Sequence, residues 1–76
     1  MEAVHIDVQG LTCSDAVVRL HKTLTPMKAG ALVHITADDW AVLIDLRKYA
    51  DRGGHAWVAE RKGKDGTFEV EVKRGA

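Results

Sequence analysis

Cys13, the one cysteine of this 76-residue chain, is the side chain that most plainly suggests chemistry. It lies in the run Gly10-Leu11-Thr12-Cys13-Ser14-Asp15. Thr12 is a good N-cap, so Cys13 is expected to be the first residue of a helix, among unpaired backbone N–H groups. These groups and the helix dipole lower a cysteine pKa, whereas the Asp15 carboxylate acts in the opposite direction, and we expect a moderately activated thiol. The simpler interpretation is a half-buried residue that fills the corner between a strand and a helix.

A single cysteine limits the chemistry that one chain can perform. A thioredoxin-type cycle is excluded within the chain, because it needs a second cysteine close by. The same corner would suit a persulfide, Cys–S–S⁻, carried as cargo. A Cys/His nucleophile pair forms only if the fold brings a histidine to Cys13, which the sequence leaves open. The four histidines, at positions 5, 21, 34 and 55, lack metal-ligand spacing, so we predict solvent-facing or core-edge histidines, no metal site and no cofactor.

Length and charge point to one small domain over residues 1–76. Eleven basic and eleven acidic residues cancel and are mixed along the chain, so we expect no nucleic acid as a stable ligand. No apolar run approaches the roughly 18 residues that span a bilayer, and the first residues lack a signal-peptide pattern. A cytoplasmic, soluble protein that does not associate with membranes is therefore expected. The oligomeric state stays open.

Hydrophobic periodicity predicts six elements in the order β-α-β-α-β-β. Strands are expected at 4–8, 32–36, 55–61 and 68–73, and apolar and polar residues alternate in the first and the last of them. Helices are expected over 13–28, ended by Pro26 and Gly30, and over 40–52, capped by Asp38 or Asp39. The run Gly63-Lys64-Asp65-Gly66 predicts a hairpin turn between the last two strands, since the Asp-Gly pair supplies the backbone freedom that a tight turn needs. The fold class is therefore α+β, a two-layer α/β sandwich in which two helices cover one face of a four-stranded mixed sheet.

Each helix has an apolar stripe for the core. The stripes are Ala16, Val17, Leu20, Leu24 and Met27 in the first helix, and Val42, Leu43, Leu46, Tyr49 and Ala50 in the second. Trp40 and Ile44, four residues apart, lie outside the second stripe. They either complete the core, which is the simpler interpretation, or expose an apolar patch as a partner surface. The other face of the sheet is expected to present His5, Asp7, Glu69, Glu71 and Lys73 to water.

The segment from Asp7 to Cys13 resembles the opening of the TusA/SirA-like sulfur carriers, whose pattern is roughly L-D-x-R-G-L-x-C-P-x-P. Further matches follow along almost the whole chain at Lys22, Gly30, Ala37-Asp38-Asp39, Asp45-Leu46, Gly54-His55 and Val58-Ala59. The resemblance implies a β-α-β-α-β-β sandwich whose Cys13 accepts sulfane sulfur as a persulfide and passes it on. Such a protein is a transfer protein more than a turnover enzyme. The implied partners are sulfur donor and acceptor proteins of the rhodanese, cysteine desulfurase or DsrE-like kinds.

The sequence departs from that family pattern beside the cysteine. Ser14 and Ala16 replace both prolines, and Gln9 stands where arginine is usual. A proline after the cysteine would preorganise the first helical turn, whereas Ser14 can only bond to nearby backbone. An alternative function is therefore a non-catalytic regulatory or protein-interaction module with the same fold, and a redox sensor is a third hypothesis.

Heavy-metal-associated domains also have a similar motif, G-M-T-C-x-x-C. That motif needs two thiolates to hold a soft metal, and Ala16 stands where the second would be. Those domains also place a hairpin before the second helix, whereas here the predicted hairpin follows it. We reject this family.

Overall fold

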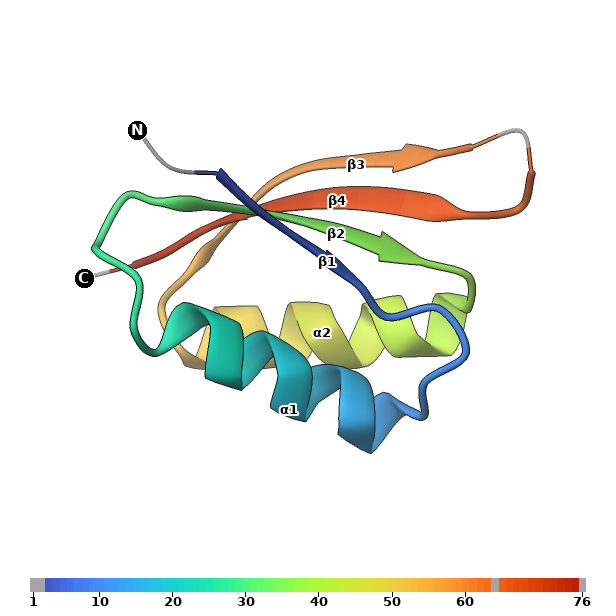
Figure 1. Cartoon of the computed structure of the whole chain (residues 1–76), viewed down its shortest axis with the longest axis horizontal. Coiled ribbons are helices and arrows are strands. Elements are labelled where there is room, and N and C mark those ends of the chain that lie inside the picture. The colour runs from blue at the N-terminus through green and yellow to red at the C-terminus, as the bar shows by residue number, and fades with distance from the viewer. Residues whose placement is uncertain (1–2, 64, 76) are drawn as a thin grey trace.

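The computed structural model describes residues 3–63 and 65–75, which form a two-layer α+β sandwich (Figure 1). The elements are β1 (Ala3–Asp7), α1 (Cys13–Leu24), β2 (Leu32–Ala37), α2 (Trp40–Arg52), β3 (Ala56–Lys62) and β4 (Phe68–Lys73). The predicted element order and the fold class are confirmed, and α2 has the bounds that its periodicity predicted.

The four strands form one mixed sheet in the order β1-β2-β4-β3. β1 runs parallel to β2, while β4 is antiparallel to both of its neighbours, β2 and β3. The last strand of the chain thus lies inside the sheet, between two strands that precede it. Both helices cover the same face, side by side, and both begin at the same end of the sandwich (Figure 1). That arrangement brings the first turn of α1 close to the first turns of α2.

The core lies between the helix layer and the sheet. Its buried side chains are Ile6, Val8, Ala16, Leu20, Leu24, Val33, Ile35, Ala37, Val42, Leu43, Leu46, Ala50, Val70 and Val72. Within 3–63 and 65–75, no polar or charged side chain is buried. Both predicted helix stripes face this core, with Val17, Met27 and Tyr49 only partly buried at its edge. Removing apolar surface from water is the main term that stabilises a core of this kind.

The first helix ends earlier than its sequence pattern predicted. It stops at Leu24 instead of continuing to residue 28. The Thr25 hydroxyl donates to the His21 carbonyl at 2.7 Å, and the Thr25 N–H donates to the same carbonyl at 3.0 Å. Pro26 has no N–H, so it cannot donate the next helical hydrogen bond, which would go to the Lys22 carbonyl.

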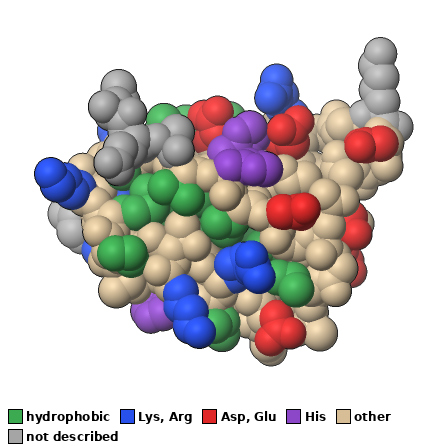
Figure 2. Space-filling model, viewed as in Figure 1, with side chains coloured by type: hydrophobic (Ala, Val, Ile, Leu, Met, Phe, Trp, Pro, Cys, Tyr) green, Lys and Arg blue, Asp and Glu red, His purple; other side chains and the backbone are tan. Residues whose placement is uncertain are grey.

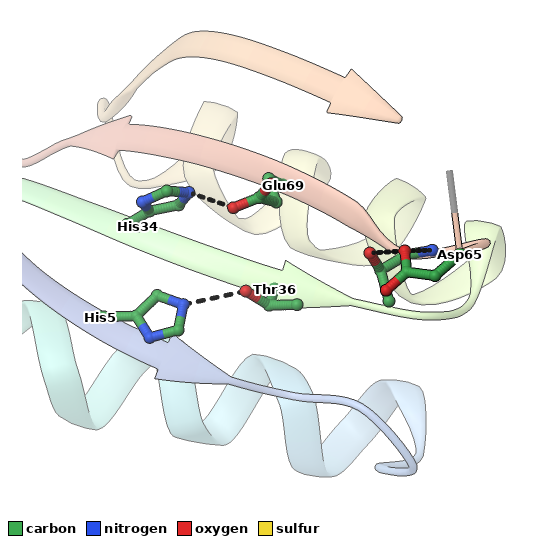
Figure 3. A network of polar contacts seen from close by, with 6 residues as sticks. His5, His34, Thr36, Asp65 and Glu69 are labelled. Atoms are coloured by element: carbon green, nitrogen blue, oxygen red, sulfur yellow. Dashed lines mark hydrogen bonds and ion pairs between the residues drawn. The ribbon is translucent and has the colours of Figure 1, made fainter. Parts of the chain in front are cut away.

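The last two strands form the predicted hairpin. The Gly63 N–H donates to the Thr67 carbonyl at 2.7 Å, and the Asp65 carboxylate accepts from the Thr67 hydroxyl at 2.6 Å (Figure 3). Gly66 has a φ of +86°, which favours glycine. Lys64, part of the predicted turn, lies outside the described residues.

The third strand is an edge of the sheet and is mostly exposed. Its register against β4 shifts between Trp57 and Ala59. Trp57 is half-buried and the neighbouring Val58 is exposed, as expected for side chains on opposite faces.

The open face of the sheet carries polar side chains. His5, Asp7 and Lys73 are exposed there, and Glu69 and Glu71 are half-buried, in line with the prediction. In the view of Figure 2, histidine and acidic side chains lie next to one another at the top, over the sheet layer, while lysine and arginine side chains are spread over both layers.

Candidate functional site at the cysteine corner

Cys13 is the first residue of α1, as Thr12 predicted. Thr12 has an extended backbone (φ −69°, ψ 164°), and its hydroxyl accepts from the Asp15 N–H at 3.1 Å. The Thr12 carbonyl accepts the first helical hydrogen bond, from the Ala16 N–H at 2.9 Å. This is one half of a capping box, in which a glutamate at the Asp15 position would reach back to the N-cap backbone. Thr12 therefore determines where the helix begins and where the thiol lies.

The loop before Cys13 is fastened to both neighbouring strand ends. The Val8 N–H donates to the Thr36 carbonyl at 2.9 Å, and the Leu11 N–H donates to the Val8 carbonyl at 3.2 Å. Gly10 has a φ of +77°, and its N–H donates to the Asp38 carboxylate at 3.3 Å. These contacts constrain the cysteine loop without either proline of the family pattern.

The predicted site residues are contiguous in the chain and form one corner of the molecule. Cys13 is half-buried and packs against the core, and Leu11 is half-buried beside it. Gly10, Thr12, Ser14 and Asp15 are exposed around them. The Cys13 side chain therefore packs against apolar neighbours and stays partly accessible.

The pKa of the Cys13 thiol is raised, and the expectation of an activated thiol is wrong. The largest cause is hydrogen bonding with the Asp45 side chain, followed by desolvation and by the negative charges of Asp45 and Asp39. The backbone at the start of α1 lowers the pKa, as the helix-dipole argument requires, but it is the smallest contribution. A nearby carboxylate disfavours the thiolate because two anions repel each other. The opposing carboxylates come from α2 and its N-cap, whereas Asp15 was the one considered from the sequence.

Asp45 is the site residue that sequence reasoning did not single out. It is half-buried on α2, adjacent to the buried Leu46. A hydrogen bond 2.8 Å long links His21 of α1 to Tyr49 of α2. Asp45 lies one helical turn before Tyr49, on the same side of α2 and toward the beginning of α1. One signal for it was available, namely the family match at Asp45-Leu46.

The histidines do not pair with the cysteine. His21 and His55 are hydrogen-bonded to Tyr49 and to the Gly75 N–H. On the open sheet face, His5 contacts the Thr36 hydroxyl at 2.9 Å, and His34 lies 3.2 Å from the Glu69 carboxylate (Figure 3). His5 and His21 are exposed while His34 and His55 are half-buried, which confirms the predicted solvent-facing and core-edge positions.

Two negative findings concern the described part of the chain. Its residues contain no group of three or more histidine, cysteine, aspartate or glutamate side chains placed to hold a metal ion. Neither of its helices is long and apolar enough to cross a membrane.

Trp40 and Ile44 are exposed, at 54 % and 42 %, so the interpretation that they complete the core is wrong. Trp40 lies against Phe68 at the start of β4, with ring centroids 5.5 Å apart and planes tilted by 52°. That contact holds the indole in place while much of it stays accessible.

Comparison with known proteins identifies the family. The family model described as sulfurtransferase TusA matches residues 4–74, which include all six elements except the first residue of β1. The chain belongs to the TusA family. The sulfur carrier protein TusA of Pseudomonas syringae pv. syringae (strain B728a) is 35 % identical over 69 residues, covering 91 % of this chain and 81 % of the relative. The sulfur carrier protein TusA of Allochromatium vinosum is 30 % identical over 69 residues, covering 91 % and 90 %.

A solved structure shares the fold. The SirA-like protein of Desulfitobacterium hafniense superposes with a TM-score of 0.84 and is 27 % identical, covering 96 % of this chain and 99 % of that protein. The TusA/SirA-like resemblance noted in the sequence is thereby confirmed, despite Ser14 and Ala16 in place of the two prolines.

Proposed function

We propose that this chain is a sulfur carrier that accepts sulfane sulfur as a persulfide on Cys13 and passes it to a partner protein. The observation that carries the proposal is the placement of Cys13, half-buried at the first position of α1, in a chain that matches the TusA family over residues 4–74. The relatives named above as sulfur carrier proteins support it.

The chemistry consists of two thiol-exchange steps of the same kind. The Cys13 thiol loses its proton, and its sulfur attacks the outer sulfur of a donor persulfide. A bond forms between Cys13 Sγ and that sulfur, the donor S–S bond breaks, and the donor sulfur leaves as a thiolate with the electron pair. In the second step an acceptor thiolate attacks the outer sulfur, and Cys13 is the leaving thiolate. Neither step needs an external oxidant or reductant.

The raised pKa of Cys13 suits a carrier that reacts only when a partner is bound. Because the thiolate is the form that exchanges and oxidises, a thiol kept protonated by Asp45 and Asp39 is less reactive in the free protein. A donor or acceptor with basic side chains would offset those carboxylates when it docks. The same property argues against a redox sensor, because sensor cysteines have a low pKa.

The partners that fit this chemistry are proteins with reactive persulfides or thiols. Rhodanese, cysteine desulfurase and DsrE-like proteins are the proposed donors and acceptors, and the proposed compartment is the cytoplasm. The protein itself contributes the cysteine loop of Gly10, Leu11, Thr12, Ser14 and Asp15, which holds Cys13 in place.

Intact-mass spectrometry after incubation with a sulfane donor tests the proposal. Wild-type protein is expected to gain one sulfur atom that a reducing thiol removes. Cys13→Ala is expected to gain none, and Val58→Ala, changed at an exposed residue of β3 outside the cysteine loop, serves as the control that still loads. A wild-type protein that gains no sulfur, or a gain that persists in Cys13→Ala, would overturn the proposal.

A second candidate function is a non-catalytic interaction module, which the exposure of Trp40 and Ile44 favours. The patch they form would bind a partner protein without any reaction at Cys13. In that case Ile44→Glu abolishes binding of a partner identified by crosslinking, whereas Cys13→Ala leaves binding unchanged. Val58→Glu, at another exposed apolar residue, is the matched control. Partner binding that depends on Cys13 and not on Ile44 would exclude this second function.

A further inference from the structure

At the end of the sandwich away from Cys13, the segment after β4 is held by a histidine side chain. The Gly75 N–H donates to Nδ1 of His55 at 2.9 Å, across 20 residues of sequence. His55 directly precedes β3, and its own N–H donates to the Ala50 carbonyl of α2 at 2.9 Å. In Figure 1 the end of β4 lies on the opposite side of the molecule from the beginning of α1.

The direction of this hydrogen bond determines the protonation state of His55. A backbone N–H can only donate, so Nδ1 must offer a lone pair, and the ring proton must lie on Nε2. An imidazolium ring carries protons on both nitrogens and cannot accept from Gly75. The contact is therefore compatible with neutral His55 alone.

Among the described residues, no carboxylate is hydrogen-bonded or ion-paired with His55. The Tyr49 ring of α2 stacks on it, with centroids 6.1 Å apart and planes 29° apart, and the Tyr49 hydroxyl is bonded to His21 of α1. The cation after β4 is Arg74, whose Nε donates to the Leu24 carbonyl at 3.0 Å. Desolvation of the ring and the charge of Arg74 both lower the pKa of His55.

Tight packing restricts both ends of the contact. A Cβ at position 53 would lie 2.8 Å from the His55 ring, and a Cβ at position 75 would overlap the Gly54 carbonyl oxygen. Glycine at both positions therefore lets the Gly75 backbone approach the imidazole closely.

The backbone on the other side of the contact is held independently of His55. The Arg74 N–H donates to the Ala31 carbonyl, and the Gly30 N–H donates to the Arg74 carbonyl, both at 2.8 Å. The Gly75 carbonyl accepts from Arg74 Nη1 at 3.1 Å, a contact within the same short segment. The chain can therefore open after Arg74 while Arg74 itself stays paired.

We propose that His55 is a proton-operated latch, which holds the Gly75 backbone when the ring is neutral and releases it when the ring is protonated. Protonation adds a positive charge beside Arg74, and release frees the Gly75 backbone from His55. The latch does not involve Cys13, since the neighbouring Arg74 contacts Leu24, at the end of α1 away from the cysteine.

Nuclear magnetic resonance of the uniformly ¹⁵N-labelled full chain tests the latch. At neutral pH a scalar coupling through the hydrogen bond is expected between the Gly75 nitrogen and His55 Nδ1. As the pH falls below the ordinary histidine pKa of about 6.5, this coupling should vanish with the titration of the His55 ring. The hydrogen-exchange protection factor of Gly75, corrected for intrinsic exchange, should fall by about tenfold in the same step, as expected for one lost hydrogen bond.

Two variants separate the latch from general acid effects. His55→Phe keeps a ring for Tyr49 but has no acceptor, so Gly75 should be unprotected at every pH. His5→Gln, on the open sheet face, should leave the Gly75 step unchanged. The proposal is overturned if wild-type Gly75 shows no coupling to His55, or if its protection changes in step with another histidine. The wild-type titration decides this even if His55→Phe does not fold.

Discussion

Replacing Thr12 with alanine removes the side chain that caps α1 at the cysteine. The Thr12 hydroxyl is the acceptor for the Asp15 N–H, 3.1 Å away, and no methyl group can replace it. Loss of a threonine N-cap costs about 1 kcal/mol in the free energy of unfolding, within a range of about 0.5 to 2 kcal/mol. A chain of this length has a total stability of roughly 4 to 11 kcal/mol, so the loss is a sizeable fraction. It corresponds to a fall in Tm of about 4 to 8 °C.

Urea unfolding under reducing conditions, followed by far-ultraviolet circular dichroism, measures this effect. Thr12→Ser keeps the acceptor and should stay within about 0.5 kcal/mol of wild type. Ser14→Ala is the matched control, since Ser14 is exposed in the first turn of α1 but does not cap it. Equal slopes against urea are required, so that a shifted midpoint reports stability alone. If Thr12→Ala unfolds at the wild-type midpoint, or if Thr12→Ser is equally destabilised, the capping argument is wrong.

Three further predictions concern the thiol, the core and the pH dependence of stability. Asp45→Asn should lower the pKa of Cys13 and shift the pH profile of its alkylation rate to lower pH. Asp51→Asn, at an exposed residue of the same helix, should leave that profile unchanged. An unshifted profile in Asp45→Asn would exclude Asp45 as the main cause of the raised pKa. Leu20→Ala should lower the free energy of unfolding, measured in urea, by about 2 to 5 kcal/mol, because Leu20 is buried in the core. Val18→Ala, at an exposed residue of the same helix, should lower it by about 0.5 kcal/mol or less. Equal losses in the two variants would contradict the assigned core. The fold lowers the pKa of His55, so below about pH 6.5 the unfolded chain binds more protons than the folded chain does. The free energy of unfolding should therefore decrease as the pH falls below about 6.5. His55→Gln should flatten that slope in urea midpoints taken at several pH values, and an unchanged slope would exclude His55 as its source.

Local patterns predicted most of the elements, because caps and hydrophobic periodicity act over a few residues. Thr12 and Asp39 begin the two helices as their side chains indicated, and Asp39 accepts from the Ala41 N–H at 2.9 Å. The end of α1 was misplaced because the apolar residue Met27 extends the helical period past Pro26. The missing N–H at Pro26 prevails over that period.

The order of the strands and the electrostatics of the thiol depend on contacts between distant segments. β4 pairs with β2, more than 30 residues earlier in the chain, and no local pattern specifies that pairing. Asp45 lies 32 residues after Cys13, so its effect on the thiol follows only from the packing of α1 against α2. The contact of Gly75 with His55 likewise needed the fold.

Sulfur transfer through Cys13 is the central claim, and a chase with labelled sulfur tests it most directly. Protein loaded with a heavy-isotope outer sulfur is freed of donor and mixed with an acceptor protein that carries one reactive cysteine. The label is expected to leave Cys13 and to appear as a persulfide on the acceptor, and the carrier should return to its unloaded mass. Label that stays on the chain, or that reaches the acceptor equally from a Cys13→Ala preparation treated in the same way, would contradict the claim.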